Sequence, residues 1–479
     1  MTQLPATIVP GRMRLMMAGA LLSVAIGSLD QGIVNTALPR IASGFSALPH
    51  LSWIVTAFML TSTVTTPVYG ALGDSMGRRR MLMTSLALFT GGSMLCGAAW
   101  SMNALILFRA VQGLGSGGLI ALALSIVVDL VPRNRRGQVQ GMFSAVMGVC
   151  GIAGPFLGGL ITTILSWRWT FYINLPVGII ALGLVAMLPR DTRRAERFDW
   201  MGAVLMALAT TALLILFSLD NRSGAGTQLG LLAATLVLGV AAVGWEVQTT
   251  TTPILAVDLF RNRTISISLA IVTLQVAAVS AVGVTLPLFF QLEMGMGAAR
   301  SGVMLVPQTA AMIVASMVSG RILREGDRIR PILVGTQLAA AGATLAIGVC
   351  IRFAPGMLDL SACMILLGAA FGLSFPCIAG ITQNAALHHQ LTRATSLMMY
   401  LRWLGASAGI ALCGRLLVAW LPRGAGAMGI DSLAAGGDAS LVTAYRTGII
   451  AIFLVNGAMF LLAAVLVRIL PLARAGDAD

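Results

Sequence analysis

The chain contains no lysine, and all 31 of its basic residues are arginine. Without lysine there is no nucleotide-binding loop of the G-x-x-x-x-G-K-[ST] type, whose lysine contacts the nucleotide phosphates. ATP hydrolysis through such a loop is therefore excluded. Charge of both signs is scarce, because charged residues make up only 10% of the sequence, whereas a soluble protein has about 25%. The chain is too poor in charge for a soluble protein.

Apolar residues make up 57% of the sequence. A helix of about 20 mostly apolar residues crosses a bilayer core about 30 Å thick. Lipid cannot satisfy backbone polar groups, and the apolar stretches lack the alternation of outer-membrane strands, so helices are expected. The sequence predicts an all-α integral membrane protein with fourteen spans. Their approximate bounds are 13–38, 52–73, 81–100, 104–130, 138–165, 170–189, 200–219, 228–245, 264–291, 300–322, 331–351, 358–386, 393–420 and 443–469.

Histidine and cysteine form no catalytic or metal-binding pattern. His50, His388 and His389 lie near span ends, there is no H-E-x-x-H motif, and no nucleophile–base pair is evident. The six cysteines all lie within apolar segments without metal-ligand spacing, so they are expected to be small buried hydrophobic residues. An intramembrane enzyme is poorly supported, and we expect no catalytic residue, metal or cofactor.

The net charge of +14 indicates topology rather than nucleic-acid binding. If the N-terminus is cytoplasmic, most arginines fall in loops on the inner side, as the positive-inside rule requires. An even number of spans then places both termini in the cytoplasm. Arg12 and Arg14 lead directly into the first span, so we expect no separate cleavable signal. The inner clusters are Arg78/Arg79/Arg80, Arg133/Arg135/Arg136, Arg190/Arg193/Arg194/Arg197, Arg261/Arg263 and Arg321/Arg324/Arg328/Arg330.

Two interruptions divide the spans into groups of six, two and six. The charged stretch 190–199 follows the sixth span, and 246–263, which contains Pro253, follows the eighth. The predicted domains are an N-terminal six-helix bundle (1–198), an inserted two-helix hairpin with a cytoplasmic linker (199–262), and a C-terminal six-helix bundle with a short tail (263–479). Two six-span halves indicate the two-bundle plan of secondary transporters.

Asp30 is a carboxylate deep within an apolar span, where an ionised acid costs roughly 3 kcal/mol on insertion scales. Sixteen residues, about 24 Å of helix, separate it from Arg14, so with little tilt it lies past the midplane toward the outside. Burial disfavours the charged form of a carboxyl group. Asp30 is therefore expected to take up and release a proton as its cavity faces alternate sides, and a cationic substrate would displace that proton. The alternative is a structural aspartate bonded to neighbours such as Asn35.

Arg109 is a second charge within a span. Gly113 and Gly117 follow it at four-residue spacing, which allows close approach of another helix. A buried guanidinium needs carbonyls, Gln112 or a carboxylate as its partner. Asp30 is the obvious carboxylate; the alternative is an arginine that packs helices by bonding to carbonyls of the first span.

Arg402 is a third intramembrane charge, within the thirteenth expected span and followed by Gly405 and Gly409. Two roles remain open for it. It either binds anionic groups or locks the two bundles together.

Four segments occur in order along the chain: 29–39 (LDQGIVNTALP), 70–80 (GALGDSMGRRR), 109–115 (RAVQGLG) and 148–159 (GVCGIAGPFLGG). Together they resemble the major facilitator superfamily, and within it the fourteen-helix drug:proton antiporter branch. The departures are Gly32, where threonine is usual, and Gly73 and Ser75 in the second segment. The resemblance implies a major facilitator fold of two six-helix bundles plus an inserted two-helix hairpin.

The resemblance also implies roles for individual residues. Asp30, Arg109, Gln112 and Arg402 are expected to serve proton coupling or substrate binding. A gating motif lies at the inner ends of the second and fourth spans. Its ion pairs either close the inner side or simply anchor the topology. The motif comprises Gly70, Asp74, Gly77, Arg78 and Asp129. An antiporter motif that makes the fifth helix kinked and thin on one face comprises Gly151, Gly154, Pro155, Gly158 and Gly159.

By this resemblance the chain is expected to be a secondary active exporter in the bacterial inner membrane. It would exchange protons for hydrophobic, cationic drugs by alternating access. The alternative is a proton-coupled exporter of one metabolite or siderophore, which the shared motifs do not separate from a drug exporter. In a Gram-negative host, similar exporters sometimes join a periplasmic adaptor and an outer-membrane channel. No nucleic-acid partner is expected.

Overall fold

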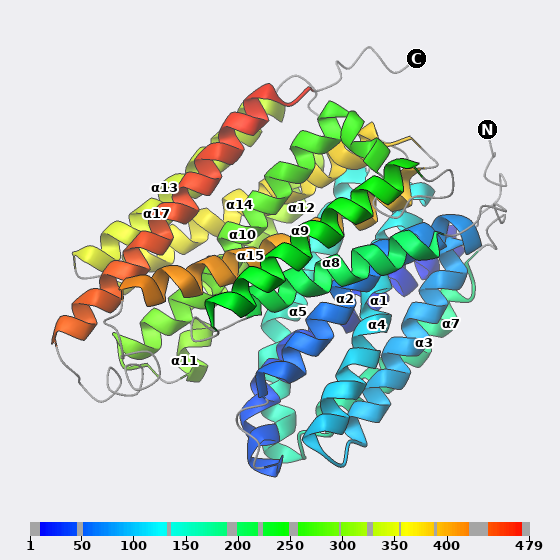
Figure 1. The fold of residues 1–479 in the computed structure, drawn as a ribbon, viewed down its shortest axis with the longest axis horizontal. Helices are drawn as coiled ribbons and strands as arrows, with labels where there is room; N and C mark the ends of the chain where they lie inside the picture. Colours follow the sequence, from blue (N-terminus) through cyan, green and yellow to red (C-terminus); the bar gives the residue numbers. More distant parts are fainter. Residues whose placement is uncertain are drawn as a thin grey trace.

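The computed structural model describes residues 10–45, 51–131, 136–188, 199–218, 224–248, 257–296, 298–322, 329–353, 356–387, 390–420 and 439–471. Helices account for nearly all of these residues, and no strand occurs among them. Two groups of helices, one from each half of the chain, lie beside each other with α8 and α9 across the front (Figure 1).

The first helix group contains α1 to α7. Its members are α1 (Pro10–Phe45), α2 (Leu51–Met76), α3 (Arg78–Gly97), α4 (Met102–Leu130), α5 (Arg136–Ile164), α6 (Trp169–Tyr172) and α7 (Asn174–Val185). Within it, α1 packs against α5, α7 and α4, while α4 also packs against α2 and α3. The connection between α2 and α3 is the single residue Gly77, whose φ of 97° favours glycine.

The second helix group contains α10 to α17. Its members are α10 (Arg263–Leu292), α11 (Ala298–Val303), α12 (Val306–Ile322), α13 (Ile329–Arg352), α14 (Met357–Ala385), α15 (Leu391–Trp420) and α17 (Ala439–Ile469). Here α12 and α13 pack against α14, α13 also packs against α17, and α10 packs against α15. A short 3-10 helix, η3 (Val257–Arg261), precedes α10.

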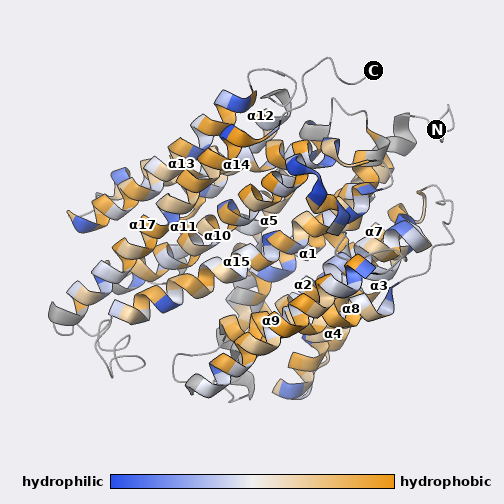
Figure 2. Ribbon diagram, turned by 45° about the horizontal axis from the view of Figure 1, so that its top comes forward, coloured by the Kyte–Doolittle hydropathy of each residue, from blue (hydrophilic) through white to orange (hydrophobic). Residues whose placement is uncertain are grey.

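Two further helices, α8 (Trp200–Ser218) and α9 (Ala225–Gln248), lie between the groups in the sequence. They pack against each other, and α8 also contacts α2 and α15. The side chains of α9 are largely exposed although they are apolar, as at Leu229 (67%) and Val240 (72%). Figure 2 shows hydrophobic residues along both helices, as along the rest of the molecule. Such a surface is stable in lipid rather than in water.

The helices confirm an all-helical, multi-pass membrane protein. Among the described residues, twelve helices are long and apolar enough to cross a membrane. The other two expected spans, 81–100 and 170–189, correspond to α3 and to the α6–α7 segment. The first of these is not among the twelve, and the second is shorter and interrupted at Ile173.

One end of the molecule collects most of the described arginines, and we call it the basic end. Contacts there join the start of α3 to the residue after α7 (Arg79 to Ala186 O), the end of α2 to the start of α15, and the start of α10 to Pro471 after α17. The first turns of α1 lie at this end too, because Gly19 contacts the end of α7. Thus α1 starts and α17 finishes at the same end (Figure 1). Its arginines include Arg78, Arg79, Arg80, Arg261, Arg263, Arg330 and Arg393.

The two helix groups meet at the basic end along two seams. In one, Gly70 of α2 lies against Ser396 of α15. In the other, α5 lies against α12, where the Ser316 hydroxyl donates to the carbonyl of Gly141 at 3.5 Å and Gly320 contacts the backbone of Gln138. Toward the opposite end the ribbons of the two groups spread apart (Figure 1). The structure is therefore closed at the basic end.

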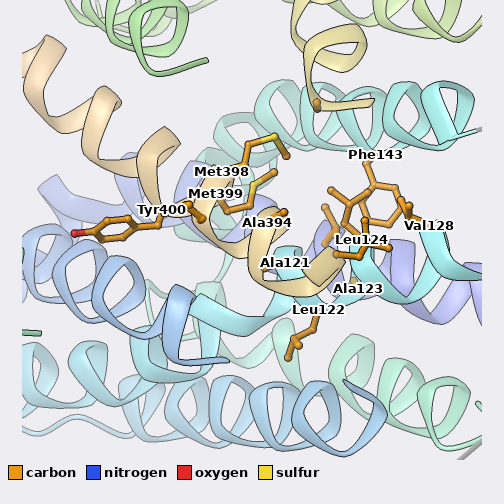
Figure 3. Close-up of a cluster of buried hydrophobic side chains, with 14 of the residues drawn as sticks. Ala121, Leu122, Ala123, Leu124, Val128, Phe143, Ala394, Met398, Met399 and Tyr400 are labelled. Atoms are coloured by element: carbon orange, nitrogen blue, oxygen red, sulfur yellow. The ribbon is translucent and has the colours of Figure 1, made fainter. Parts of the chain in front are cut away.

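A shared hydrophobic core holds the groups together near these seams. Figure 3 shows side chains of α15 lying beside those of α4 and α5. Leu124 and Phe143 come from the first group, and Ala394 and Met398 come from the second, and all four are buried. This core is continuous between the two halves of the chain.

Candidate functional site

Asp30 lies in α1 with its side chain turned into the interior of the first helix group, where it is 0% exposed. Three side chains donate hydrogen bonds to its carboxylate. Arg109 Nη1 lies 2.7 Å from Oδ2, and Gln112 Nε2 and Asn174 Nδ2 each lie 2.9 Å from Oδ1. Both carboxylate oxygens thus accept hydrogen bonds, and the donors come from α4 and α7.

Arg109 is buried almost as completely, at 1% exposure. In addition to its ion pair with Asp30, it donates to Gln112 Oε1 at 2.8 Å and to the carbonyl of Ile54 in α2 at 3.4 Å. Its guanidinium carbon lies 4.1 Å from the centre of the Phe58 ring, a cation–π distance. Among the described residues, the carbonyl that accepts from Arg109 belongs to α2, whereas the alternative from the sequence expects carbonyls of the first helix.

Asn174 and Ser93 extend this network to α3 and to the α6–α7 segment. Asn174 donates to Ser93 Oγ at 2.9 Å, and Ser93 donates to the carbonyl of Phe171 at 2.8 Å. The sequence analysis overlooked both residues. The signal for Asn174 was present, because it is a strongly polar residue between Ile173 and Leu175 in an apolar segment. Its position at the start of α7, where the helix is interrupted, directs its amide toward Asp30.

The Asp30 carboxylate joins three helices. Asp30 lies in α1, and its three donors lie in α4 and α7. Removing one partner of such a buried ion pair costs about 3–5 kcal/mol. The alternative partner suggested by the sequence, Asn35, lies outside the residues whose side chains are described.

The gating residues lie at the basic end, where the two helix groups meet. Asp74 Oδ1 is 3.4 Å from Arg78 Nη2, and its Oδ2 is 3.6 Å from Arg393 Nε. The Arg78 pair joins α2 only to α3, within the first group. Arg393, which the sequence analysis did not single out, joins Asp74 to the second group by an ion pair. The side chain of Asp129, at the end of α4, lies outside the described residues.

We expect Arg393→Gln to loosen the closure at the basic end, because it removes the ion pair between α2 and α15. Hydrogen–deuterium exchange should then rise severalfold in peptides covering the end of α2 and the start of α15. Arg330→Gln is the matched control, since Arg330 donates to Leu470 O within the second group. Unchanged exchange in Arg393→Gln would show that this pair does not hold the seam.

The four glycines of the antiporter motif divide into two pairs. Gly154 lies against the backbone of Gly32, and Gly158 lies against Thr36 and the carbonyl of Ile33, all in α1. A Cβ at Gly151 or Gly159 would meet no atom within 4 Å. Only the first pair therefore brings α5 close to α1. Pro155 lies within α5, but its side chain is outside the described residues.

Arg402 does not belong to the Asp30 network. It lies in the middle third of α15 and is partly buried. Its Nη1 is 3.5 Å from the sulfur of Met147 in α5 and 3.9 Å from that of Met399, and its guanidinium carbon lies 5.3 Å from the centre of the Phe375 ring in α14. Arg402 therefore contacts both helix groups.

Metal-binding groups are not found in the part of the chain that the structure describes. No cluster of three or more histidine, cysteine, aspartate or glutamate side chains occurs there in a geometry that could hold an ion. His50, His388 and His389 lie outside that part.

Comparison with known proteins identifies the family. A family model described as Major Facilitator Superfamily matches residues 20–410, which is most of the chain. The chain belongs to the major facilitator superfamily. It is therefore a membrane transporter of small molecules and not an enzyme.

Curated relatives of this transporter include two from Bacillus subtilis (strain 168). Multidrug transporter protein MdtP is 31% identical over 409 residues, covering 84% of this chain and 75% of the relative. Multidrug resistance protein 3 is 28% identical over 402 residues, covering 83% of this chain and 78% of the relative.

Solved structures show the same fold at low sequence identity. The human organic anion transporter MFSD10 (TETRAN) aligns with a TM-score of 0.67 and 16% identity, covering 97% of this chain and 100% of that one. The proton:xylose symporter XylE aligns with a TM-score of 0.68 and 13% identity, covering 96% of each chain. At these identities the likeness concerns the fold alone.

Proposed function

We propose that this transporter exports hydrophobic drugs from the bacterial cytoplasm in exchange for protons. The observation that carries the proposal is the Asp30–Arg109 ion pair, which is enclosed within the first helix group at 0% and 1% exposure. A buried, ionisable pair at the depth of the bilayer is expensive to maintain and is expected to be functional. The names of the two Bacillus relatives support drugs as the substrates.

The membrane topology that fits this function has fourteen crossings. The twelve long apolar helices would be joined by α3 and by the α6–α7 segment, and α8 and α9 would form an inserted hairpin. The domains are then 1–198, 199–262 and 263–479. The arginines of the basic end would face the cytoplasm, together with both termini, according to the positive-inside rule. The closed basic end corresponds to an outward-facing state of the bacterial inner-membrane protein.

Proton uptake from the outer side would drive the change of state. When Asp30 takes a proton, Arg109 loses its counter-ion, and α1, α4 and α7 rearrange. Rigid movement of one helix group against the other then opens the seams at the basic end. A substrate from the cytoplasm would favour the opposite change and the release of the proton. Asp74 and Arg393 would separate during this movement and pair again after it.

Substrate and proton would be coupled indirectly in this scheme. The sequence suggests that a cationic drug displaces the proton from Asp30 itself. Direct displacement requires the drug to reach a carboxylate that is 0% exposed and bonded to three donors. Coupling through the arrangement of the helices requires no such contact. Cationic drugs therefore remain proposed substrates, but not necessarily ligands of Asp30.

Drug-stimulated proton release from reconstituted vesicles tests this function. Ethidium, a hydrophobic cation, should cause release of protons from acid-loaded vesicles that contain the transporter and should accumulate in them. Empty vesicles are the control. If neither ethidium nor any member of a drug panel moves protons or confers resistance in an efflux-deficient host, the protein is not a proton-coupled drug exporter.

The same host screen addresses the alternative, a proton-coupled exporter of one metabolite or siderophore. Resistance to several unrelated drugs would favour the drug exporter, whereas loss of one excreted metabolite on gene deletion would favour the alternative. In a Gram-negative host, co-purification would test for a periplasmic adaptor and an outer-membrane channel.

A further inference from the structure

Arg402 is a guanidinium without a described counter-ion at the interface of the two helix groups. Among the described residues, no carboxylate lies within 4.0 Å of it, whereas Arg78, Arg109, Arg393 and Arg446 each have one. It is partly exposed although it lies far from both ends of α15. Arg402 is thus only partly buried where the two helix groups face each other.

The neighbours of Arg402 do not satisfy its hydrogen-bonding groups. A guanidinium carries five N–H donors, and thioether sulfur is only a weak acceptor. The contacts with Met147, Met399 and the ring of Phe375 account for its position, but none of them carries a negative charge. A charged group in a low-dielectric site requires a partner of opposite charge. A ligand can supply this partner.

Apolar groups beside the guanidinium would suit the rest of such a ligand. Phe371 and Phe375 stack on each other at 5.6 Å, with an angle of 22° between their planes, and Phe371 is partly exposed. Met147 and Met399 are flexible and polarizable, so they adapt to ligands of different shape. One cation thus lies beside an aromatic and thioether surface.

We infer that the substrates of this transporter include hydrophobic organic acids whose carboxylate pairs with Arg402. Guanidinium binds carboxylate through two parallel hydrogen bonds, which fixes the orientation of the ligand as well as its charge. The apolar body of the acid packs on Phe371 and Met147, which are both partly exposed. This inference rests on the proposed export function and names a substrate class for it.

The charge of such a substrate has a consequence for energetics. When one proton enters for each anion that leaves, positive charge moves inward twice in every cycle. An inside-negative membrane potential therefore drives export of an acid, whereas exchange of one proton for one monovalent cation is electroneutral. The dependence of export on membrane potential distinguishes the two classes of substrate.

A matched pair of probes tests the inference: 1-naphthylacetate, which is an acid, and 1-naphthylacetamide, which has the same aromatic body without charge. Their binding to the purified transporter and their transport in vesicles are measured. Arg402→Gln should weaken binding and export of the acid about tenfold to a hundredfold, the range of one charge-assisted hydrogen-bonded contact. Binding and export of the amide should change less than twofold. An imposed potential should accelerate export of the acid only with Arg402 present.

Two further variants make the test specific. Arg402→Lys keeps the charge but loses the bidentate geometry, so it should bind the acid with intermediate affinity. Arg415→Gln removes another arginine of α15, which donates to the carbonyl of Leu216, and should leave acid binding unchanged. The elution profile of each variant in detergent reports its folding.

The opposing outcomes are distinct. If Arg402→Gln lowers the binding and export of the acid and of the amide equally, Arg402 locks the helix groups and the inference is wrong. The same conclusion follows if Arg402→Gln does not fold and Arg402→Lys binds the acid no better than it binds the amide. It is also wrong if the wild-type transporter does not bind the acid. Ethidium-driven proton release by the wild type is measured in parallel, so that failure of the export function itself is recognised separately.

Discussion

Asp30→Asn is expected to abolish proton-coupled export while the protein still folds. Asparagine has nearly the same size and still accepts hydrogen bonds, so Gln112 and Asn174 keep an acceptor. It cannot take up or release a proton. Arg109 loses its counter-ion but keeps Gln112 Oε1, the carbonyl of Ile54 and the Phe58 ring. Proton release driven by ethidium in vesicles should fall at least a hundredfold, to the level of empty vesicles.

Asp359→Asn is the matched control for this variant. Asp359 is an acid in the first turn of α14 and is exposed, so its neutralisation should leave proton release within twofold of the wild type. A thermal melt in detergent should show a clear decrease in stability for Asp30→Asn, by up to about 3–5 kcal/mol, since a buried ion pair has been broken. Proton exchange at the wild-type rate in Asp30→Asn would remove this residue from the mechanism.

Gly158→Val is expected to disrupt the packing of α1 against α5. A Cβ at this position would overlap Thr36 and lie 2.5 Å from the carbonyl oxygen of Ile33, so the two helices would have to separate. Overpacking a close contact costs about 1–3 kcal/mol or more. Because α1 also carries Asp30, its displacement should reduce both the yield of monodisperse protein and transport at least tenfold.

Gly159→Val tests whether this effect comes from the contact rather than from loss of a glycine. A Cβ at Gly159 would meet no atom within 4 Å, and the residue lies in the same helix, one position further along. Yield and transport of Gly159→Val should stay within twofold of the wild type. Equal loss in both variants would mean that the segment needs glycine for bending, not for its contact with α1.

The sequence predicts the helices well because the bilayer imposes a simple requirement on them. A span must be apolar over about 20 residues, and its backbone must bond within itself. The expected segment 138–165 corresponds to α5 (Arg136–Ile164), and 358–386 corresponds to α14 (Met357–Ala385). The segment 170–189 is less simple, because its helix is interrupted at Ile173. Apolar composition does not reveal such an interruption.

The candidate site was only partly predictable. The sequence points to Asp30, Arg109 and Gln112, because charged and amide groups are conspicuous within apolar spans. Asn174 lies 144 positions from Asp30, and no local pattern connects the two. Arg393 looks like one more arginine at a helix end until the fold brings it to Asp74.

The sequence by itself determined that this chain is a helical membrane protein, that two ionisable residues, Asp30 and Arg109, lie within apolar spans of its first half, and that it resembles a family of transporters. These conclusions follow from the cost of charge in lipid, which acts on each residue separately. Only the tertiary structure decided which partners surround Asp30, which glycines hold α1 to α5, and that Arg402 lies between the helix groups without a described carboxylate. Those features depend on distances between helices that are remote in the sequence, and packing alone sets those distances.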